Sequence, residues 1–186
     1  TGGYVIKNID HLPELPTRRL IYNCSAVPGK YILEIDLLAC SSILNWFIDN
    51  FYDPKKDNFE EINKDIASCY GKNISVTAIP YPKGKSVEEN DTRIRTAFTN
   101  IGLSTTKKDM LYALMTSLFT EINDGIDILR SHGLVSSVII GGGLTNSEIM
   151  NQMQADAYNL EIKRTPVIEA TAIGALISVL VAQHVY

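Results

Sequence analysis

Residues 138–148 read Val-Ile-Ile-Gly-Gly-Gly-Leu-Thr-Asn-Ser-Glu and are the most informative part of the chain. The apolar run that ends at Ile140 is typical of a strand buried on both faces. Three glycines follow it, and a helix is expected to begin near Asn146 or Ser147. Glycines let a ligand approach the backbone closely, and a helix start offers free N–H groups at its positive dipole end. This combination favours a nucleotide or anion site.

Two observations limit that interpretation. A tight strand-to-helix turn without a ligand explains the glycine run about equally well. The spacing also matches neither the dinucleotide-binding fingerprint nor the P-loop.

Helices and strands alternate on both sides of the glycines. Apolar residues recur at helical spacing before and after them, and Gly133 stops the long helix. We expect a long helix over about 104–132, a strand at 135–140, a helix at 146–158, a short strand at 160–163 and an apolar helix from 169 to about 184.

The first half of the chain begins with strands. Alternating apolar and polar residues predict strands at 3–9, 19–24 and 31–37, joined by short turns as an antiparallel meander. Helices at 39–52 and 59–70, strands at 74–79 and 96–101, and an exposed loop at 80–92 follow. The predicted fold is α/β, with a three-stranded antiparallel meander followed by alternating helices and strands in one mixed sheet.

Length and composition indicate a single globular domain. The chain has 186 residues, of which 45% are hydrophobic and 20% charged, and its formal net charge is -4. These values exclude a disordered tail, a collagen-like repeat and a coiled-coil rod. The mildly acidic charge argues against general nucleic-acid binding.

Location and completeness can also be predicted. No leader peptide is visible, and the longest apolar stretch is too short to span a bilayer. Three cysteines without metal-ligand spacing fit a reducing compartment, so we expect a cytoplasmic protein. A first residue of Thr1 rather than Met suggests a fragment.

Several segments together resemble the FGGY carbohydrate kinases, in particular the C-terminal signature of xylulokinase- and gluconokinase-like members. The resemblance covers nearly the whole chain, and its set of motifs is more specific than any single one. It rests on Ile140-Gly141-Gly142-Gly143, Asn146-Ser147, Gln152, Ala155-Asp156, Glu169-Ala170-Thr171-Ala172, Gly174-Ala175, Thr1-Gly2-Gly3 as the remainder of a Gly-Thr-Gly phosphate loop, a helix carrying Asn45-Trp46 and Asp49, and Ile79-Pro80-Tyr81 with Gly84.

The resemblance implies two ribonuclease H-like domains of the actin-like ATPase type, of which this chain is the second. Residues 1–186 would form one nucleotide-binding domain, with 53–103 as an insertion before the long helix. The N-terminal half, which holds the sugar and the catalytic residues, would be absent.

For individual residues the resemblance implies contacts with ATP. The glycine loop would lie against the adenosine, a polar side chain after it would bond near the adenine, and the phosphates would meet the chain start. The expected ATP-binding residues are Gly142 and Gly143, Asn146 and Ser147, Thr1 and Gly2, and Ser41 and Asn45 on a bordering helix.

No catalytic or metal-binding residue is predicted in this chain. In the resembling family, an aspartate of the first domain acts as general base on the sugar hydroxyl, and Mg²⁺ neutralises phosphate charge. ATP and Mg²⁺ are the expected cofactors. The loop after Tyr81 departs from the family's usual Gly-Glu-Arg…Pro sequence, which indicates a lost role or a changed specificity.

Other candidate sites are weaker. His11, His132 and His184 are isolated and fit surface or helix-end roles better than catalysis. The acidic side chains of Glu88, Glu89 and Asp91, and of Glu34 and Asp36, fit solvated surfaces better than metal sites. Trp46 is expected in the core rather than as a stacking platform for a base.

Two functions follow. The first is ATP-dependent phosphorylation of a sugar or sugar acid, of pentulose or gluconate type, by a longer enzyme in which this chain is the ATP-binding half. The second is a non-catalytic nucleotide-binding or regulatory domain.

The expected partners are a sugar in the interdomain cleft and the N-terminal kinase domain of the same polypeptide, with no nucleic acid and no membrane. Phe47, Phe51 and the last helix are expected to be exposed at a domain or subunit contact, a homodimer included.

Overall fold

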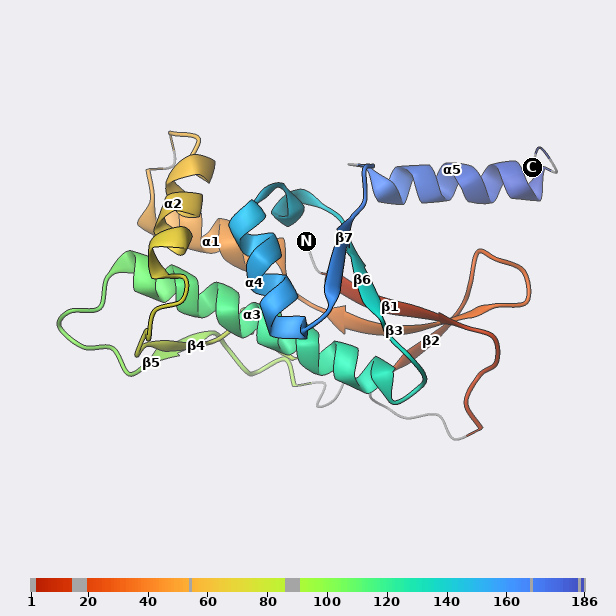
Figure 1. The fold of residues 1–186 in the computed structure, drawn as a ribbon, viewed down its shortest axis with the longest axis horizontal. Helices are drawn as coiled ribbons and strands as arrows, with labels where there is room; N and C mark the ends of the chain where they lie inside the picture. Colours follow the sequence, from red (N-terminus) through yellow and green to blue (C-terminus); the bar gives the residue numbers. More distant parts are fainter. Residues whose placement is uncertain are drawn as a thin grey trace.

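The computed structural model describes residues 3–14, 20–53, 55–85, 91–167, 169–183 and 185. The predicted phosphate contacts Thr1 and Gly2 lie outside these residues. The elements, in chain order, are β1 (Gly3–Ile9), β2 (Ile21–Cys24), β3 (Tyr31–Leu37), α1 (Ser41–Phe51), α2 (Phe59–Cys69), β4 (Thr77–Ile79), β5 (Ala97–Thr99), α3 (Lys107–Arg130), β6 (Ser137–Ile140), the 3₁₀ turn η1 (Gly143–Asn146), α4 (Glu148–Tyr158), β7 (Glu161–Arg164) and α5 (Ala170–Ala182) (Figure 1).

The first three strands form an antiparallel sheet, but not the predicted meander. Their order is β1-β3-β2, so the third strand lies in the middle. β3 turns Leu33, Ile35 and Leu37 into the core, whereas β2 is mostly exposed. The central position therefore goes to the strand with the most apolar surface to bury.

The remaining strands do not extend this sheet, which corrects the expectation of one mixed sheet. β4 and β5 form an antiparallel pair, and β6 and β7 form a separate parallel pair. The expectation that β6 is buried on both faces is also wrong, because Ile139 is 73% exposed while Ile140 is buried. One face of the strand packs on the helices, and the other has no covering element in the described part of the chain.

The core is assembled along α3, the longest helix. Leu114, Met115 and Leu118 are fully or almost fully buried in a cluster with side chains of α1, α2 and α4. Gly125 lets α3 approach the sheet, since a Cβ there would lie 3.3 Å from Ile35 Cδ1. α3 is therefore the element on which the helices and the first sheet are both packed.

The aromatic residues of α1 differ from their predictions. Phe47 is fully buried rather than exposed, and its ring stacks on that of Phe51 with centroids 4.4 Å apart. Phe51 is 39% exposed, as expected. Trp46, predicted in the core, is 43% exposed and touches Phe47 and Phe51 edge-on. The helix is rotated so that its Phe47 face, rather than its Trp46 face, meets α3.

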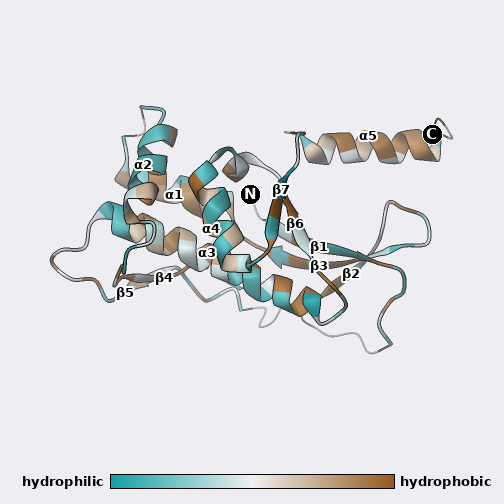
Figure 2. Cartoon of the chain, in the orientation of Figure 1, coloured by the Kyte–Doolittle hydropathy of each residue, from teal (hydrophilic) through white to brown (hydrophobic). Residues whose placement is uncertain are grey.

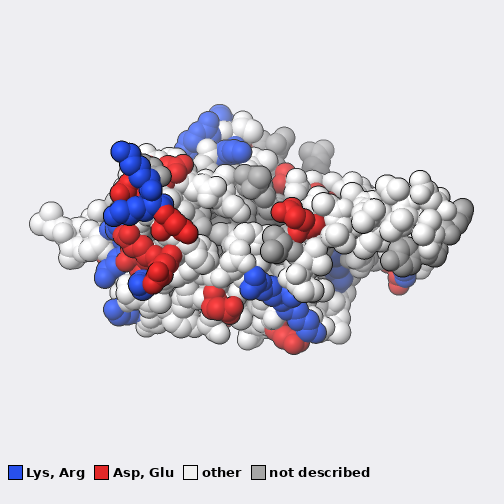
Figure 3. All heavy atoms as spheres, turned by 90° about the horizontal axis from the view of Figure 1, so that it is seen from above, with Lys and Arg blue, Asp and Glu red and all other residues white. Residues whose placement is uncertain are grey.

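The last helix, α5, projects from the body and has no buried residue. Its surface is almost continuously apolar, and it carries no charged side chain (Figures 2 and 3). The prediction that this helix is exposed is confirmed. Each helix of the described residues is too short or too polar to cross a bilayer.

Candidate functional site

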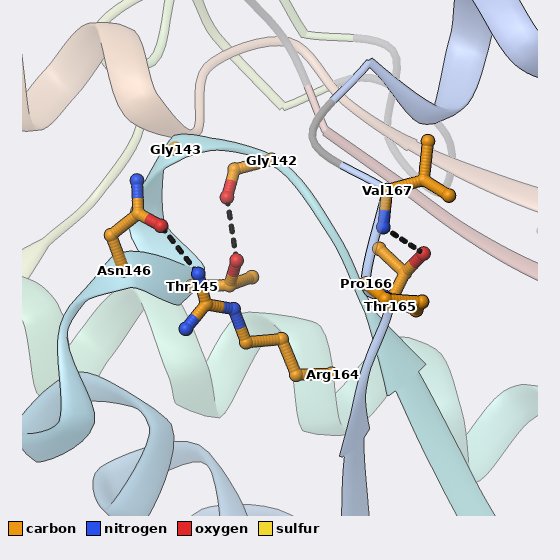
Figure 4. Close-up of a pocket in the computed structure, with 8 residues that line it drawn as sticks. All are labelled: Gly142, Gly143, Thr145, Asn146, Arg164, Thr165, Pro166 and Val167. Carbon is orange, nitrogen blue, oxygen red and sulfur yellow. Dashed lines mark hydrogen bonds between the residues drawn. The ribbon is translucent and has the colours of Figure 1, made fainter.

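A cavity of about 290 Å³ lies between the glycine loop after β6 and the segment after β7. Because these two strands are parallel, their carboxyl ends lie at the same edge, where ligands commonly bind in α/β sheets. The lining residues are Gly142, Gly143, Thr145, Asn146, Arg164, Thr165, Pro166 and Val167 (Figure 4).

The three glycines of the loop are needed for different reasons. A Cβ on Gly141 would lie 2.9 Å from Thr165 Cγ2, so the strand ends can approach only if this residue lacks a side chain. Gly142 has a φ of 95°, which L-residues with side chains rarely adopt. A Cβ on Gly143 would meet nothing within 4 Å. Among the described residues no contact requires a glycine at this position, and Gly143 lines the cavity.

Thr145 holds the loop in shape. It is buried, and its hydroxyl donates to the Gly142 carbonyl at 2.8 Å. The Asn151 amide in turn donates to the Thr145 carbonyl at 2.9 Å. These bonds close the 3₁₀ turn, so the backbone that lines the cavity is fixed before any ligand binds. The sequence analysis did not select Thr145.

Ser147 lies at the base of the loop and not in the cavity. It is fully buried and is the N-cap of α4, where its hydroxyl accepts from Met150 N at 3.2 Å. The same hydroxyl donates to Asn63 Oδ1 of α2. Both uses of the hydroxyl are structural, and Ser147 is not among the described residues that line the cavity.

Asn146 and Arg164 are the polar side chains that face each other across the cavity. Arg164 Nη2 donates to Asn146 Oδ1 at 2.6 Å (Figure 4). Arg164 ends β7 and pairs in register with Ile140, which brings it to the glycine loop. Arg164 was not among the site residues predicted from the sequence. The signal that could have found it is the strand-helix-strand order, which places the two strand ends together.

The predicted site residues thus separate into groups. Gly142, Gly143 and Asn146 line one cavity. Ser41 begins α1 and is partly buried, and Asn45 is exposed on the same helix. Neither of these two α1 residues is among the residues that line the cavity.

The lining of the cavity suits binding rather than chemistry. Among the described residues that line it, Arg164 is the only charged one, and the Thr145 and Thr165 hydroxyls already have partners at the Gly142 carbonyl and the Val167 N–H. Within the described residues no group of three His, Cys, Asp or Glu side chains could hold a metal ion. The cavity can hold a flat polar ligand through backbone, amide and guanidinium groups.

Comparison with known proteins identifies related chains. Residues 8–183 match the model of the C-terminal domain of the FGGY family of carbohydrate kinases. A xylulose kinase of Staphylococcus epidermidis is 34% identical over 155 residues, which are 82% of this chain and 30% of that protein.

Solved structures share the fold. A gluconate kinase of Lactobacillus acidophilus superposes on 100% of this chain and 38% of its own, with a TM-score of 0.84 and 16% identity. A Plasmodium falciparum glycerol kinase with ADP matches 100% of this chain and 37% of its own, with a TM-score of 0.80 and 20% identity. The chain therefore spans about a third of the length of these relatives.

Proposed function

This chain belongs to the FGGY family of carbohydrate kinases, as its C-terminal domain, and on that premise we propose that it supplies the ATP-binding half of a two-domain sugar kinase. The observation that carries the proposal is the glycine loop beside an open cavity. Gly143 has no contact within the chain that requires a glycine, yet it lines that cavity. A flat base that lies against the backbone would account for it.

The residues present fit a nucleotide. Gly142 and Gly143 would lie against the adenosine, and Asn146 would offer hydrogen bonds to the base. When bound, ATP supplies the γ-phosphoryl group that is transferred. The described residues offer no cluster for Mg²⁺, so we propose that the metal is held by the phosphates and by groups outside this chain. There it would neutralise charge as the phosphoryl group moves.

The rest of the reaction would belong to an N-terminal domain of the same polypeptide. We expect that domain to hold the sugar and the general-base aspartate, because the described residues that line the cavity include no carboxylate or imidazole. Closure of the two domains over ATP and sugar would exclude water as a competing acceptor.

The proposed substrate is a pentulose such as xylulose, or gluconate. The proposed location is the cytoplasm.

Nucleotide binding can be tested with the 186-residue chain. We expect ATP to bind weakly in calorimetric titration. Gly143→Leu should weaken it by more than about tenfold, because the new side chain would fill the cavity. Gly102→Leu is the matched control, since a Cβ at Gly102 also meets nothing within 4 Å but lies in the loop before α3. Equal ATP affinity in the two variants would argue against the proposed site.

Catalysis is tested in the longer polypeptide that contains this chain. ADP release should depend on one member of a panel of ketoses, polyols and aldonic acids, and the 186-residue chain alone should release none. ATP binding without ADP release for any sugar would favour the non-catalytic, regulatory function instead.

A further inference from the structure

We propose that Arg164 positions the Asn146 amide so that the cavity selects adenine over guanine. This inference rests on the proposed function, because it assumes that the cavity between β6 and β7 receives a nucleotide base. It assigns a specificity role to a residue that the sequence analysis did not select.

The position of Arg164 is fixed by its backbone. Its strand, β7, pairs in parallel with β6, and Thr165 N donates to the Ile140 carbonyl at 2.9 Å immediately after it. From this fixed base the side chain reaches Asn146, where Nη2 lies 2.6 Å from Oδ1. Asn146 itself closes the rigid turn that Thr145 stabilises. The backbone at both ends of the pair is therefore held by the fold, and the two exposed side chains are joined by this hydrogen bond.

The pair has a defined polarity. A guanidinium group can only donate hydrogen bonds, so Arg164 is compatible with the amide oxygen and not with the amide nitrogen. The Asn146 oxygen points toward Arg164, and the amide nitrogen lies on the other side (Figure 4). Arg164 thereby favours this orientation of the amide over the flipped one, and the Nδ2 donors stay free of that contact. The oxygen keeps a second lone pair with which it can accept from a ligand.

An amide held in this way matches adenine. Adenine presents an amino donor beside a ring-nitrogen acceptor, which an asparagine amide meets with one oxygen and one nitrogen. Guanine presents two acceptors on the same edge, O6 and N7, which suit the donor pair of an arginine. Because one Nη2 donor of Arg164 is used by Asn146, that donor is not available for the guanine pattern. The bonded pair therefore favours adenine, while a free Arg164 would favour guanine.

The experiment compares the dissociation constants of ATP and GTP for the 186-residue chain by calorimetric titration. We expect wild type to prefer ATP by about tenfold or more, the value of one good bidentate base contact. Arg164→Ala should bring the ratio close to one, because the amide can then flip. Arg164→Lys keeps a donor and should recover part of the preference. Asn146→Asp should shift the preference toward GTP, since a carboxylate only accepts and guanine has ring and amino donors.

The outcomes separate the inference from the proposed function. If ATP binds in a Gly143-dependent way but Arg164→Ala keeps the wild-type ratio, the role of Arg164 is overturned and the proposed function stands. If neither nucleotide binds, or Gly143→Leu has no effect, the proposed function fails as well. A general loss of structure would weaken both nucleotides equally, so the ratio is the diagnostic quantity, and circular dichroism melts of each variant check the fold.

Discussion

Helices α3 and α5 both carry many apolar residues, α3 on one face of an amphipathic helix and α5 along its whole length, yet they have opposite environments. α3 buries nine of its residues, among them Leu111, Leu114 and Phe119, against the sheet and three helices. α5 has no charged residue and is the more uniformly apolar of the two, but it buries none. The difference shows that a run of apolar residues can predict a helix, but it does not predict which element that helix packs against. A helix buries its apolar residues only where another element packs on it. Of these two helices, the described residues provide such an element for α3 and not for α5.

The largest expected effect on stability comes from shortening one leucine in each helix to alanine. Leu114→Ala should lower the free energy of unfolding by about 2–5 kcal/mol, because the side chain is fully buried in the core. Leu176→Ala removes the same atoms from a side chain that is 51% exposed in α5, and should change it by less than about 0.5 kcal/mol. Urea unfolding of both variants measures the contrast. A large loss in Leu176→Ala would mean that α5 is packed in solution.

A smaller effect concerns the helix starts. The Asp109 carboxylate accepts from the Thr106 N–H at 2.8 Å and from the Thr106 hydroxyl at 2.6 Å, whereas Glu169 makes no such bond at the start of α5. Asp109→Ala should therefore cost about 0.5–2 kcal/mol at neutral pH. Glu169→Ala is the matched control and should be close to neutral.

The contribution of Asp109 should also depend on pH. The hydrogen bonds from Thr106 hold the pKa of the Asp109 carboxyl below its usual range. The stabilisation is therefore present above the unfolded pKa of about 3.9 and is lost as pH falls through the lower folded value. Unfolding curves of wild type and Asp109→Ala should converge in acid. A difference that stays constant from pH 7 to pH 2 would contradict the carboxylate's role.

The smallest effect uses the glycine inside each helix. Gly174→Ala should raise the local free energy of opening of α5 by about 0.5–1 kcal/mol, because the new methyl group meets nothing within 4 Å. Gly125→Ala should gain less, since its methyl group would press on Ile35 in the α3–β3 contact. Amide hydrogen exchange in each helix measures both changes. A larger gain at Gly125 would show that the α3–β3 contact is looser than the structure indicates.

The same distinction between local and distant information explains what the sequence could predict. The helical repeat predicted the five α-helices of the described residues to within a few residues. It could do so because the repeat depends only on residues that are close in sequence. The central position of β3, the separation of the β6–β7 pair and the burial of Phe47 depend on distant partners. No local pattern carries that information.

The candidate site divides in the same way. Gly142, Gly143 and Asn146 were predicted because the chemistry of one short stretch points to them. Arg164 reaches the cavity only through the parallel pairing of two strands that lie on either side of α4. Ser147 was predicted as a ligand contact from the family resemblance, and its side chain is bonded to Asn63, which only the packing of α2 could reveal.

The Ser147–Asn63 bond has a consequence for protein engineering. Residues 53–103 were predicted as an insertion, the kind of segment that is trimmed first when a minimal binding module is made. Asn63 belongs to that segment, and it is the acceptor for the buried hydroxyl directly after Asn146. Trimming the segment would leave that hydroxyl without its acceptor, at a cost of about 1–3 kcal/mol. A shortened chain that keeps the glycine loop would therefore have to retain α2.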